Sequence, residues 1–291
     1  MMLQVLVIIV TYNGEKWIEA CLNCLSKSAR EASVMIIDNA STDNTKKIIK
    51  DKFPSFQLIE EEDNLGFGQA NNIGMKYAVQ NGFDYVFLLN QDAYVSPDTI
   101  SVLASIHEKH PEFGIISPLQ LDGKGKALDE LFRRFIVNNY PEDFVQKIES
   151  HSGDVPEVFP VRFVNAAAWF ISKECLQKVG LFHPLFYHYG EDNNYCSRSQ
   201  YHGFKAGITP LAAVCHDKIY DHDRHKLLLR QIHLVPLYIL LDLRKKRTHA
   251  IVGHLEDYRL LLERNKISLL RYKTIGFFGV QMDTSKQEDY I

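Results

Sequence analysis

Runs of apolar residues in this chain end repeatedly in clusters of small and acidic polar residues. Mostly apolar, β-branched runs predict strands at residues 3–10, 33–37, 56–59 and 84–89. Between them, apolar residues recur every three or four positions, which predicts helices such as the one over residues 68–79. Because strand and helix alternate, the pattern predicts a parallel sheet flanked by helices.

The second half of the chain has a less regular pattern. A short strand is predicted at residues 114–117, whereas residues 120–160 are polar and weakly periodic, which favours a loop-rich insertion or lid. Apolar residues resume at 161–172, and a helix is predicted over 173–179. From residue 221 onward the pattern is mostly helical, so we expect a helical extension after the sheet.

Composition and charge narrow the classes of protein that fit. With 46% hydrophobic residues and a formal net charge of -3, the chain has no overall attraction for nucleic acid. No run reaches about 18 apolar residues, and the N-terminal stretch is predicted to be a strand, not a signal peptide. Five cysteines, an odd number, predict no disulfide framework and favour a reducing, cytoplasmic location. Cys21 and Cys24 lie in a helical pattern without a second pair, which disfavours a zinc site.

Polar side chains follow the first two predicted strands. Thr11, Tyr12 and Asn13 come after the first strand, and Asp38 ends the second. Parallel strands bring their carboxyl ends to one edge of a sheet, where nucleotides bind. The Asp38 carboxylate could accept the N3–H of uracil or thymine; an Asx turn or helix cap explains the same residue without a ligand.

A glycine-rich segment, NLGFGQANN, occupies residues 64–72. Gly66 and Gly68 allow the backbone to approach a ligand closely, and a helix beginning at Gly68 would direct its N-terminus toward a phosphate. Asn64 and Asn71 add polar groups that we expect to contact the same ligand. A tight loop followed by a helix cap is the alternative.

A polar triplet, Asn90-Gln91-Asp92, ends the strand predicted at 84–89. Asn90 and Asp92 point to one side in extended geometry, and oxygen ligands at this spacing suit Mg²⁺ or Mn²⁺ bridging a diphosphate. His216, which follows the apolar run LAAVC, is a candidate further ligand. The alternatives are a strand-ending turn for the triplet and a hydrogen-bonded histidine at a strand end.

Glu191 and Asp192 form an adjacent acidic pair directly after the aromatic stretch FYHYG. Carboxylates among apolar rings are candidates for a general base with a shifted pKa. The alternative is a solvent-exposed helix start, where acids are favoured by the helix dipole.

Taken in order, TYNG, DNASTDNT, NLGFGQANN, the N-Q-D triplet, GEDNNYCSR and a late histidine resemble family 2 glycosyltransferases of the GT-A fold. The nearest resemblance is to rhamnosyltransferase-like members that build bacterial surface polysaccharides, and it covers residues 5–216. It implies an α/β nucleotide-diphospho-sugar transferase fold with a mixed, mainly parallel sheet flanked by helices. It also implies inverting transfer of a sugar from a UDP- or dTDP-linked donor to a hydroxyl of a saccharide or lipid-linked acceptor.

The resemblance also implies roles for individual residues. Asp92 matches the metal-binding acid of the family's D-x-D motif, and His216 matches a histidine on the same Mg²⁺ or Mn²⁺ ion. Asp192 matches the catalytic base, with Glu191 beside it. Thr11, Tyr12 and Asp38 match the base-binding positions of the donor, and Asn165, Ala166 and Trp169 fall in the segment that shapes the acceptor side. We expect further donor contacts from Asn13, Asn64, Gly66, Gly68, Asn71 and Asn90.

Two asparagines depart from the family pattern. Asn90 replaces the first acid of D-x-D and is a weaker cation ligand, and Asn194 replaces the last acid of E-D-x-D. A non-catalytic relative that still binds a nucleotide sugar is therefore an alternative function. A nucleotidyltransferase is a lesser one, because TYNGEKW has only one glycine and one lysine for a triphosphate loop.

We expect a catalytic domain at residues 1–220 and a helical extension at 221–291. The domain would comprise a nucleotide-binding half, 1–118, and an acceptor-binding half, 119–220. In the extension, the apolar residues 227–243 precede the basic run 244–247, a pattern that suits contact with anionic lipid at the inner face of the membrane. Packing against the catalytic domain or against another subunit of a homo-oligomer explains it equally well.

Overall fold

The computed structural model describes residues 3–29, 31–150 and 153–218, together with Leu234, Leu241 and Leu243. The chain separates into two compact units, Met1–Ile219 and Tyr220–Ile291, and every element described below belongs to the first. The predicted C-terminal helices and their membrane or subunit contact lie outside the described residues, apart from those three leucines. Among the described residues, no helix is both long and apolar enough to cross a membrane.

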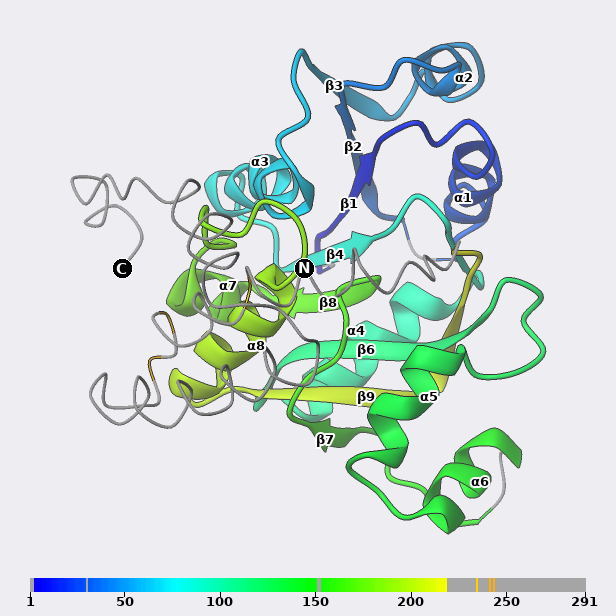
Figure 1. The fold of residues 1–291 in the computed structure, drawn as a ribbon, viewed down its shortest axis with the longest axis vertical. Coiled ribbons are helices and arrows are strands. Elements are labelled where there is room, and N and C mark those ends of the chain that lie inside the picture. Colours follow the sequence, from blue (N-terminus) through cyan, green and yellow to red (C-terminus); the bar gives the residue numbers. More distant parts are fainter. Residues whose placement is uncertain are drawn as a thin grey trace, which may run out of the picture. The chain divides into compact units, whose positions relative to one another are not determined.

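The described strands form one mixed sheet. Its order is β3-β2-β1-β4-β8-β6-β9-β5, and β7 pairs with β9 (Figure 1). The strands are β1 (Val5–Thr11), β2 (Ser33–Asn39), β3 (Gln57–Glu61), β4 (Tyr85–Leu89), β5 (Ala93–Val95), β6 (Phe113–Asp122), β7 (Phe159–Val161), β8 (Ala168–Ser172) and β9 (Lys205–His216).

The sheet has two halves of different character. Strands β1 to β4 are all parallel, as the alternation of strand and helix predicts. From β4 outward the neighbours β8, β6 and β5 join antiparallel, and only β6 and β9 run parallel. The antiparallel pair β4–β8 therefore places the start of β8 beside the end of β4, which joins the two halves at the edge that carries the polar strand ends.

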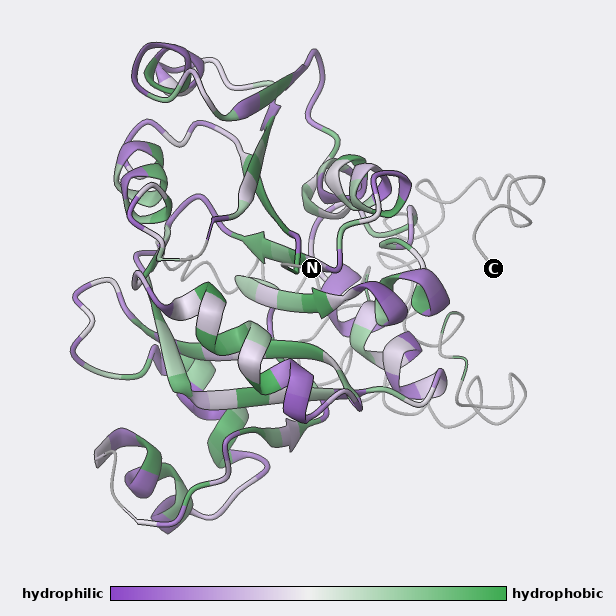
Figure 2. Cartoon of the chain, turned by 180° about the vertical axis from the view of Figure 1, so that it is seen from behind, coloured by the Kyte–Doolittle hydropathy of each residue, from purple (hydrophilic) through white to green (hydrophobic). Residues whose placement is uncertain are grey.

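Helices cover both faces of the sheet because its central strands are apolar on both sides. In β1, Val5, Val7 and Ile9 enter one core cluster, whereas Leu6 and Ile8 enter the other, as the alternation of side chains along a strand requires. Figure 2 shows green strands between helices that carry both colours. The helices are α1 (Ile18–Leu25), α2 (Thr45–Lys52), α3 (Phe67–Gln80), α4 (Thr99–Lys109), α5 (Glu130–Val137), α6 (Glu142–Ser150), α7 (Lys173–Val179) and α8 (Glu191–Tyr201).

The prediction of a loop-rich segment at residues 120–160 is wrong for most of its length, since it holds the end of β6 and the helices α5 and α6. Phe132 and Ile136 of α5 are buried in the core, as are Val145 and Ile148 of α6. Their spacing of three and four residues is helical, but each helix has only two fully buried apolar positions among many charged ones. The weak periodicity therefore concealed two short amphipathic helices.

Candidate active site

The ends of β1 and β2 lie side by side. Thr11 and Asp38 are direct partners in the parallel register, and both are fully buried. Asp38 Oδ1 accepts a hydrogen bond from the Ser41 N–H at 2.9 Å, which is the Asx-type turn expected after a strand. Asp38 Oδ2, however, is buried and has no hydrogen-bond partner. One oxygen thus shapes the loop while the other remains available to a ligand.

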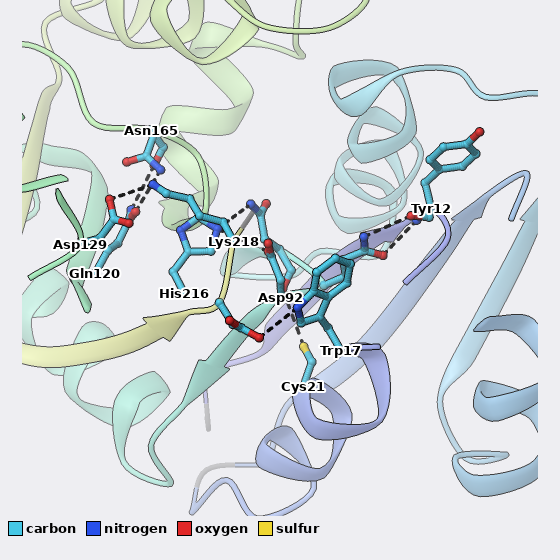
Figure 3. A network of polar contacts seen from close by, with 12 residues as sticks. Tyr12, Trp17, Cys21, Asp92, Gln120, Asp129, Asn165, His216 and Lys218 are labelled. Carbon is cyan, nitrogen blue, oxygen red and sulfur yellow. Dashed lines mark hydrogen bonds and ion pairs between the residues drawn. The ribbon is translucent and has the colours of Figure 1, made fainter. Parts of the chain in front are cut away.

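Asn13 and Tyr12 extend this edge in different ways. The Asn13 N–H donates to Ser41 Oγ at 3.0 Å, and Asn13 Oδ1 accepts from the Thr42 N–H at 2.9 Å. Asn13 therefore fastens the two loops together, in a left-handed backbone conformation with φ 47°. The Tyr12 side chain is exposed and extends away from the other labelled residues (Figure 3), so its ring is accessible to a ligand.

Gln91, the middle residue of the polar triplet, ties the end of β4 to the end of β1. Its Oε1 accepts from the Thr11 hydroxyl at 2.6 Å and from the Tyr12 N–H at 3.0 Å, and its Nε2 donates to the Tyr12 carbonyl at 3.2 Å. A Cβ at Gly14 would lie 2.1 Å from Gln91 Oε1, so this contact requires glycine. Sequence reasoning selected Asn90 and Asp92 and missed Gln91, although all three follow the same buried strand.

Asp92 and His216 meet at the ends of β4 and β9. Ala93 and His216 are partners in the antiparallel register, and Asp92 Oδ1 lies 3.4 Å from His216 Nε2. The same ring nitrogen lies 3.4 Å from Asn90 Nδ2, while His216 Nδ1 is buried without a partner. The structure therefore brings together the three residues predicted around the cation.

The side chains of Asp92 and His216 suit a cation that takes its remaining ligands from elsewhere. In the described part of the chain, no three His, Cys, Asp or Glu side chains converge to hold a metal ion. One carboxylate and one imidazole are nevertheless a normal contribution to a Mg²⁺ or Mn²⁺ site that is completed by phosphate oxygens and water. Asp217, the next residue, is turned to Trp17, whose Nε1 donates to its Oδ2 at 3.1 Å (Figure 3).

The glycine-rich segment is held against the loop that precedes α8. Asn64 Oδ1 accepts from Asn39 Nδ2 and from the Gly66 N–H, each at 2.9 Å. Gly66 has φ 78°, and a Cβ on it would lie 1.9 Å from the Tyr187 carbonyl oxygen. Gly66 is therefore required by both its backbone conformation and this close approach.

Gly68 and Asn71 lie on α3, which begins at Phe67 and not at Gly68. A Cβ at Gly68 would lie 3.1 Å from Phe182 Cβ and 3.5 Å from Glu191 Cβ, so its small size serves close packing against Phe182 in the loop after α7, with Glu191 at ordinary contact distance. Asn71 Nδ2 donates to the Phe67 carbonyl one turn back, at 2.9 Å. Their roles as donor contacts stay predictions, and both residues have a structural role without a ligand.

Glu191 and Asp192 are the first two residues of α8, as the alternative of a helix start predicted. That alternative also predicted that both acids are exposed to solvent, and they are not. Glu191 is buried, and burial together with the nearby Asp192 charge raises its pKa to about 7. Burial raises the pKa of Asp192 to about 6, although hydrogen bonds from the backbone N–H groups of Asn193 and Ala166 partly oppose the shift. A carboxylate with a pKa near neutrality is suited to general base catalysis.

The segment before β8 connects the triplet to this acid. The Asn90 N–H donates to the Ala167 carbonyl at 2.9 Å, and the backbone N–H of the neighbouring Ala166 is one of the groups that lower the pKa of Asp192. Asn165 Nδ2 donates to Oε1 of the fully buried Gln120 at 2.9 Å, and Asn165 Oδ1 has no partner. Two of the three predicted acceptor-side residues, Asn165 and Ala166, therefore lie beside the candidate base.

Trp169, the third, is fully buried. Its ring lies 6.2 Å from that of Phe182 and 5.9 Å from that of Tyr195, and its Nε1 has no partner. The structure thus places Trp169 in the core beneath the segment, where it can support the site without touching an acceptor.

Asn194, one of the two departures from the family pattern, also has a structural role. Its Oδ1 accepts from Arg198 Nε at 2.9 Å, and Arg198 in turn donates to the carbonyl oxygens of Val179 and Leu181. Asn194 is buried, and its hydrogen bond helps to anchor α8 to the end of α7. The loss of an acid at this position therefore leaves Asp192 in place.

Asp129 and Lys218 form an ion pair that sequence reasoning did not identify. Lys218 Nζ lies 2.8 Å from Asp129 Oδ1, and that oxygen also accepts the Phe132 N–H at the start of α5. Figure 3 shows Lys218 between His216 and Asp129. The pair connects α5 to the chain just after β9, so α5 is fastened beside His216 at the end of that strand.

Two independent features of the described residues mark the same loops. The non-glycine residues with positive φ are Asn13, Ala40 and Tyr189, one in each of three predicted motifs. Strained backbone of this kind persists where the surrounding structure imposes it, often at functional sites. Two buried carboxylate oxygens without a partner, Asp38 Oδ2 and Glu191 Oε2, each lie two residues from one of these positions. Other buried polar side-chain atoms without a partner in the described residues belong to Gln69, Asn165, Trp169, Tyr195 and His216.

Comparison with known proteins identifies the family. The sequence model described as Glycosyl transferase family 2 matches residues 6–179. The chain belongs to this family. It is 24% identical over 254 residues to the N-acetylglucosaminyl-diphospho-decaprenol L-rhamnosyltransferase of Mycobacterium tuberculosis, covering 81% of this chain and 83% of the relative. It is 27% identical over 215 residues to the dTDP-rhamnosyl transferase RfbF of Shigella flexneri, covering 72% and 67%.

Solved structures of glycosyltransferases share the fold. TarS 1-349 of Staphylococcus aureus, in complex with UDP-GlcNAc, superposes with a TM-score of 0.60 at 16% identity, covering 94% of this chain and 79% of TarS 1-349. The mannosyltransferase PcManGT of Pyrobaculum calidifontis, with GDP-Man and Mn²⁺, gives 0.58 at 17% identity, covering 94% and 78%. The fold is GT-A, and within the glycosyltransferase family the chain is a rhamnosyltransferase-like member.

Proposed function

We propose that this chain is a metal-dependent inverting glycosyltransferase of cell-surface polysaccharide synthesis. It would move a sugar from a UDP- or dTDP-linked donor to a hydroxyl of a saccharide or lipid-linked acceptor. The observation that carries the proposal is the strand pair β4–β8. The Asn90 N–H donates to the Ala167 carbonyl across this pair, and the backbone N–H of the neighbouring Ala166 lowers the pKa of Asp192, so the triplet with Asp92 and the candidate base lie at the same segment.

The proposed donor site lies at the ends of β1 and β2. The unpartnered Asp38 Oδ2 is a suitable acceptor for the N3–H that uracil and thymine share, and the exposed Tyr12 ring could pack against the base. A similar protein is named as a dTDP-rhamnosyl transferase, and the structurally similar TarS 1-349 was solved with UDP-GlcNAc. Both nucleotides are pyrimidine diphosphates, which agrees with the chemistry of Asp38.

Asp92 and His216 would hold a Mg²⁺ or Mn²⁺ ion, with Asn90 beside them. When bound, such an ion neutralises the negative charge that develops on a departing diphosphate. The structurally similar PcManGT and GalNAc-T7 were solved with Mn²⁺. Asp92 Oδ1 and His216 Nε2 lie 3.4 Å apart, close enough for both to bind one cation. Neither side chain forms an ion pair with a third residue in the described part of the chain, so both can serve as ligands.

Asp192 would take the proton from the attacking acceptor hydroxyl. Its half-buried position and its pKa of about 6 keep it ionised at neutral pH while leaving it basic enough to act. A single displacement that uses one base and no covalent intermediate inverts the anomeric centre. Glu191, with its higher pKa, would be partly protonated at neutral pH and would limit the negative charge beside the base.

The decisive first experiment combines nucleotide binding with transfer. Thermal stabilisation should be measured with UDP, dTDP, GDP and CDP, each with and without Mn²⁺, because a ligand that binds the native state raises its melting temperature. We expect a Mn²⁺-dependent shift with UDP or dTDP, and donor hydrolysis or transfer that requires Asp192. A nucleotide shift without any turnover would favour the non-catalytic alternative, whereas no shift at all would overturn the donor site.

The location of the protein stays a prediction, as does any contact of the C-terminal extension with a membrane or another subunit.

A further inference from the structure

Three large side chains are exposed in the loop directly before the candidate base. We call residues 185–189, with the sequence LFYHY, the aromatic loop. Leu185 is 42% exposed, Tyr187 61% and Tyr189 41%, while Phe186 between them is buried and anchors the loop. Exposed aromatic side chains gathered beside a reactive group are a typical feature of a binding surface.

The Tyr187 ring is fixed although it is exposed. Its hydroxyl donates to the Asn64 carbonyl at 3.0 Å, and its own carbonyl packs against Gly66 so closely that no Cβ would fit there. The hydroxyl of Tyr187 is therefore used within the protein, and the ring face is what the residue offers to a ligand. A ring held in place binds with little further loss of side-chain entropy.

The aromatic loop also lies next to the acids. Tyr189 has φ 71°, and its backbone N–H is one of the groups that lower the pKa of Glu191, so the strained turn that ends the loop lies beside the acid pair. Gly66, the N-cap of α3, packs against Tyr187, and Gly68 in the first turn of α3 packs near Glu191. The aromatic loop and the candidate catalytic pair therefore both lie beside the start of α3.

We infer that the aromatic loop is an acceptor subsite that binds a pyranose ring, with Tyr187 as its stacking platform. One face of a pyranose carries mainly C–H groups, and such a face packs on an aromatic ring while the hydroxyls remain hydrated. A sugar placed there would present a hydroxyl near Asp192. This inference rests on the proposed function and narrows its acceptor to a molecule whose reacting end is a pyranose.

Binding can be tested without knowing the natural acceptor. Saturation-transfer difference NMR would be recorded with methyl β-N-acetylglucosaminide and methyl α-rhamnoside, in the presence of dTDP or UDP and with Mg²⁺ in place of the paramagnetic Mn²⁺. We expect saturation transfer to the C–H protons of the ring in the wild type and in Tyr187→Phe, and its loss in Tyr187→Ala. Ribitol, a polyol without a ring, should give no signal.

A matched control is available at the far end of α8, the helix that follows the aromatic loop. Tyr201 is 56% exposed and ends α8, about 15 Å along the helix from Glu191, so Tyr201→Ala should behave as the wild type. With an acceptor that is turned over, Tyr187→Ala should raise the acceptor KM roughly tenfold and leave the donor KM unchanged. Tyr187→Phe should keep the acceptor KM close to that of the wild type.

The possible failures are distinguishable. No saccharide signal in the wild type, or an equal signal in Tyr187→Ala or with ribitol, would overturn the subsite even if nucleotides stabilise the protein. Absence of nucleotide stabilisation would instead overturn the proposed function. A third failure is loss of the signal in both Tyr187→Phe and Tyr187→Ala while both variants keep normal stability. Binding would then depend on the hydrogen bond from the Tyr187 hydroxyl to Asn64 and not on the ring, which contradicts the role of Tyr187 as a stacking platform.

Discussion

The proposed donor side and the proposed acceptor side of the site are built differently. On the donor side, the ends of β1, β2 and β4 are tied to one another by hydrogen bonds, through Gln91 to Thr11 and through Asn13 to Ser41. On the acceptor side, two adjacent acids share the start of one helix, and burial raises the pKa of both. The donor side is thus characterised by hydrogen bonds between its loops, whereas the acceptor side is characterised by two carboxyl groups with raised pKa values.

This difference indicates what each side contributes. A rigid set of loops lowers the cost of ordering the protein around a nucleotide, so changes on the donor side should weaken binding. A carboxylate with a raised pKa is stabilised in its protonated form, so changes on the acceptor side should affect proton transfer. Substitutions on the two sides should therefore separate binding from chemistry.

The largest effect should come from Asp192→Asn. The amide keeps the shape of the side chain but cannot take a proton, so we expect transfer to fall roughly 10³-fold, within the range of general base catalysis. Stabilisation by dTDP or UDP with Mn²⁺ should be unchanged. The control is Asp143→Asn, another acid in the first turn of a helix, in α6. Normal transfer by Asp192→Asn would assign the base to another residue.

The second effect, Asp92→Asn, should appear in binding. Losing the carboxylate beside His216 should weaken the Mn²⁺-dependent binding of the nucleoside diphosphate at least roughly tenfold. A Mn²⁺ titration of the melting temperature at fixed UDP or dTDP measures this, with Asp98→Asn, at the start of α4, as the control. An unchanged titration would mean that Asp92 does not hold the cation.

The contact between the two sides can be tested at Gly66. Gly66 and Gly82 have φ of 78° and 77°, but a Cβ at Gly82 would meet nothing within 4 Å. Gly82→Ala should therefore lower the free energy of unfolding by only about 1 kcal/mol, through its backbone conformation. Gly66→Ala should lower it by about 3 kcal/mol, because its Cβ also collides with Tyr187. Urea unfolding of both variants measures the difference. Equal losses would show that the α3 start is not held against the aromatic loop.

Sequence reasoning placed polar residues correctly where they end a buried strand. The ends of β1, β2 and β4 were predicted because a buried strand must be apolar and a ligand-binding edge must be polar, so the transition is visible in the sequence. Thr11, Asp38 and Asp92 are all found at this edge. The acid pair was selected for its aromatic surroundings, and the structure places it beside Ala166.

What could not be predicted depends on contacts between distant residues. Gln91 acts through hydrogen bonds to a loop about 80 positions away, and nothing near it in the sequence indicates them. Burial of Glu191 arises from packing of α3 against α8, which a helix-start pattern does not reveal. Trp169 was assigned to the acceptor side, yet its place in the core is decided by neighbours on α8 and in the loop after α7.

The smallest predicted effect concerns the pH dependence of stability on the acceptor side. Glu191 has a folded-state pKa of about 7, above its ordinary value of 4.5, so between these values the folded protein holds a proton that the unfolded chain has released. The free energy of unfolding should therefore fall as pH rises through this window, and the loss is complete above about pH 7. Glu191→Gln removes this ionisation and should be more stable relative to the wild type at about pH 8 than at about pH 5, by about 1–2 kcal/mol. Urea unfolding at both pH values measures the difference, with the exposed Glu31→Gln as the control. If the stability of the wild type and of Glu191→Gln changed with pH in parallel, Glu191 would have an ordinary pKa in the folded protein. Asp192 would then be the one acid with a raised pKa on which the contrast between the donor side and the acceptor side depends.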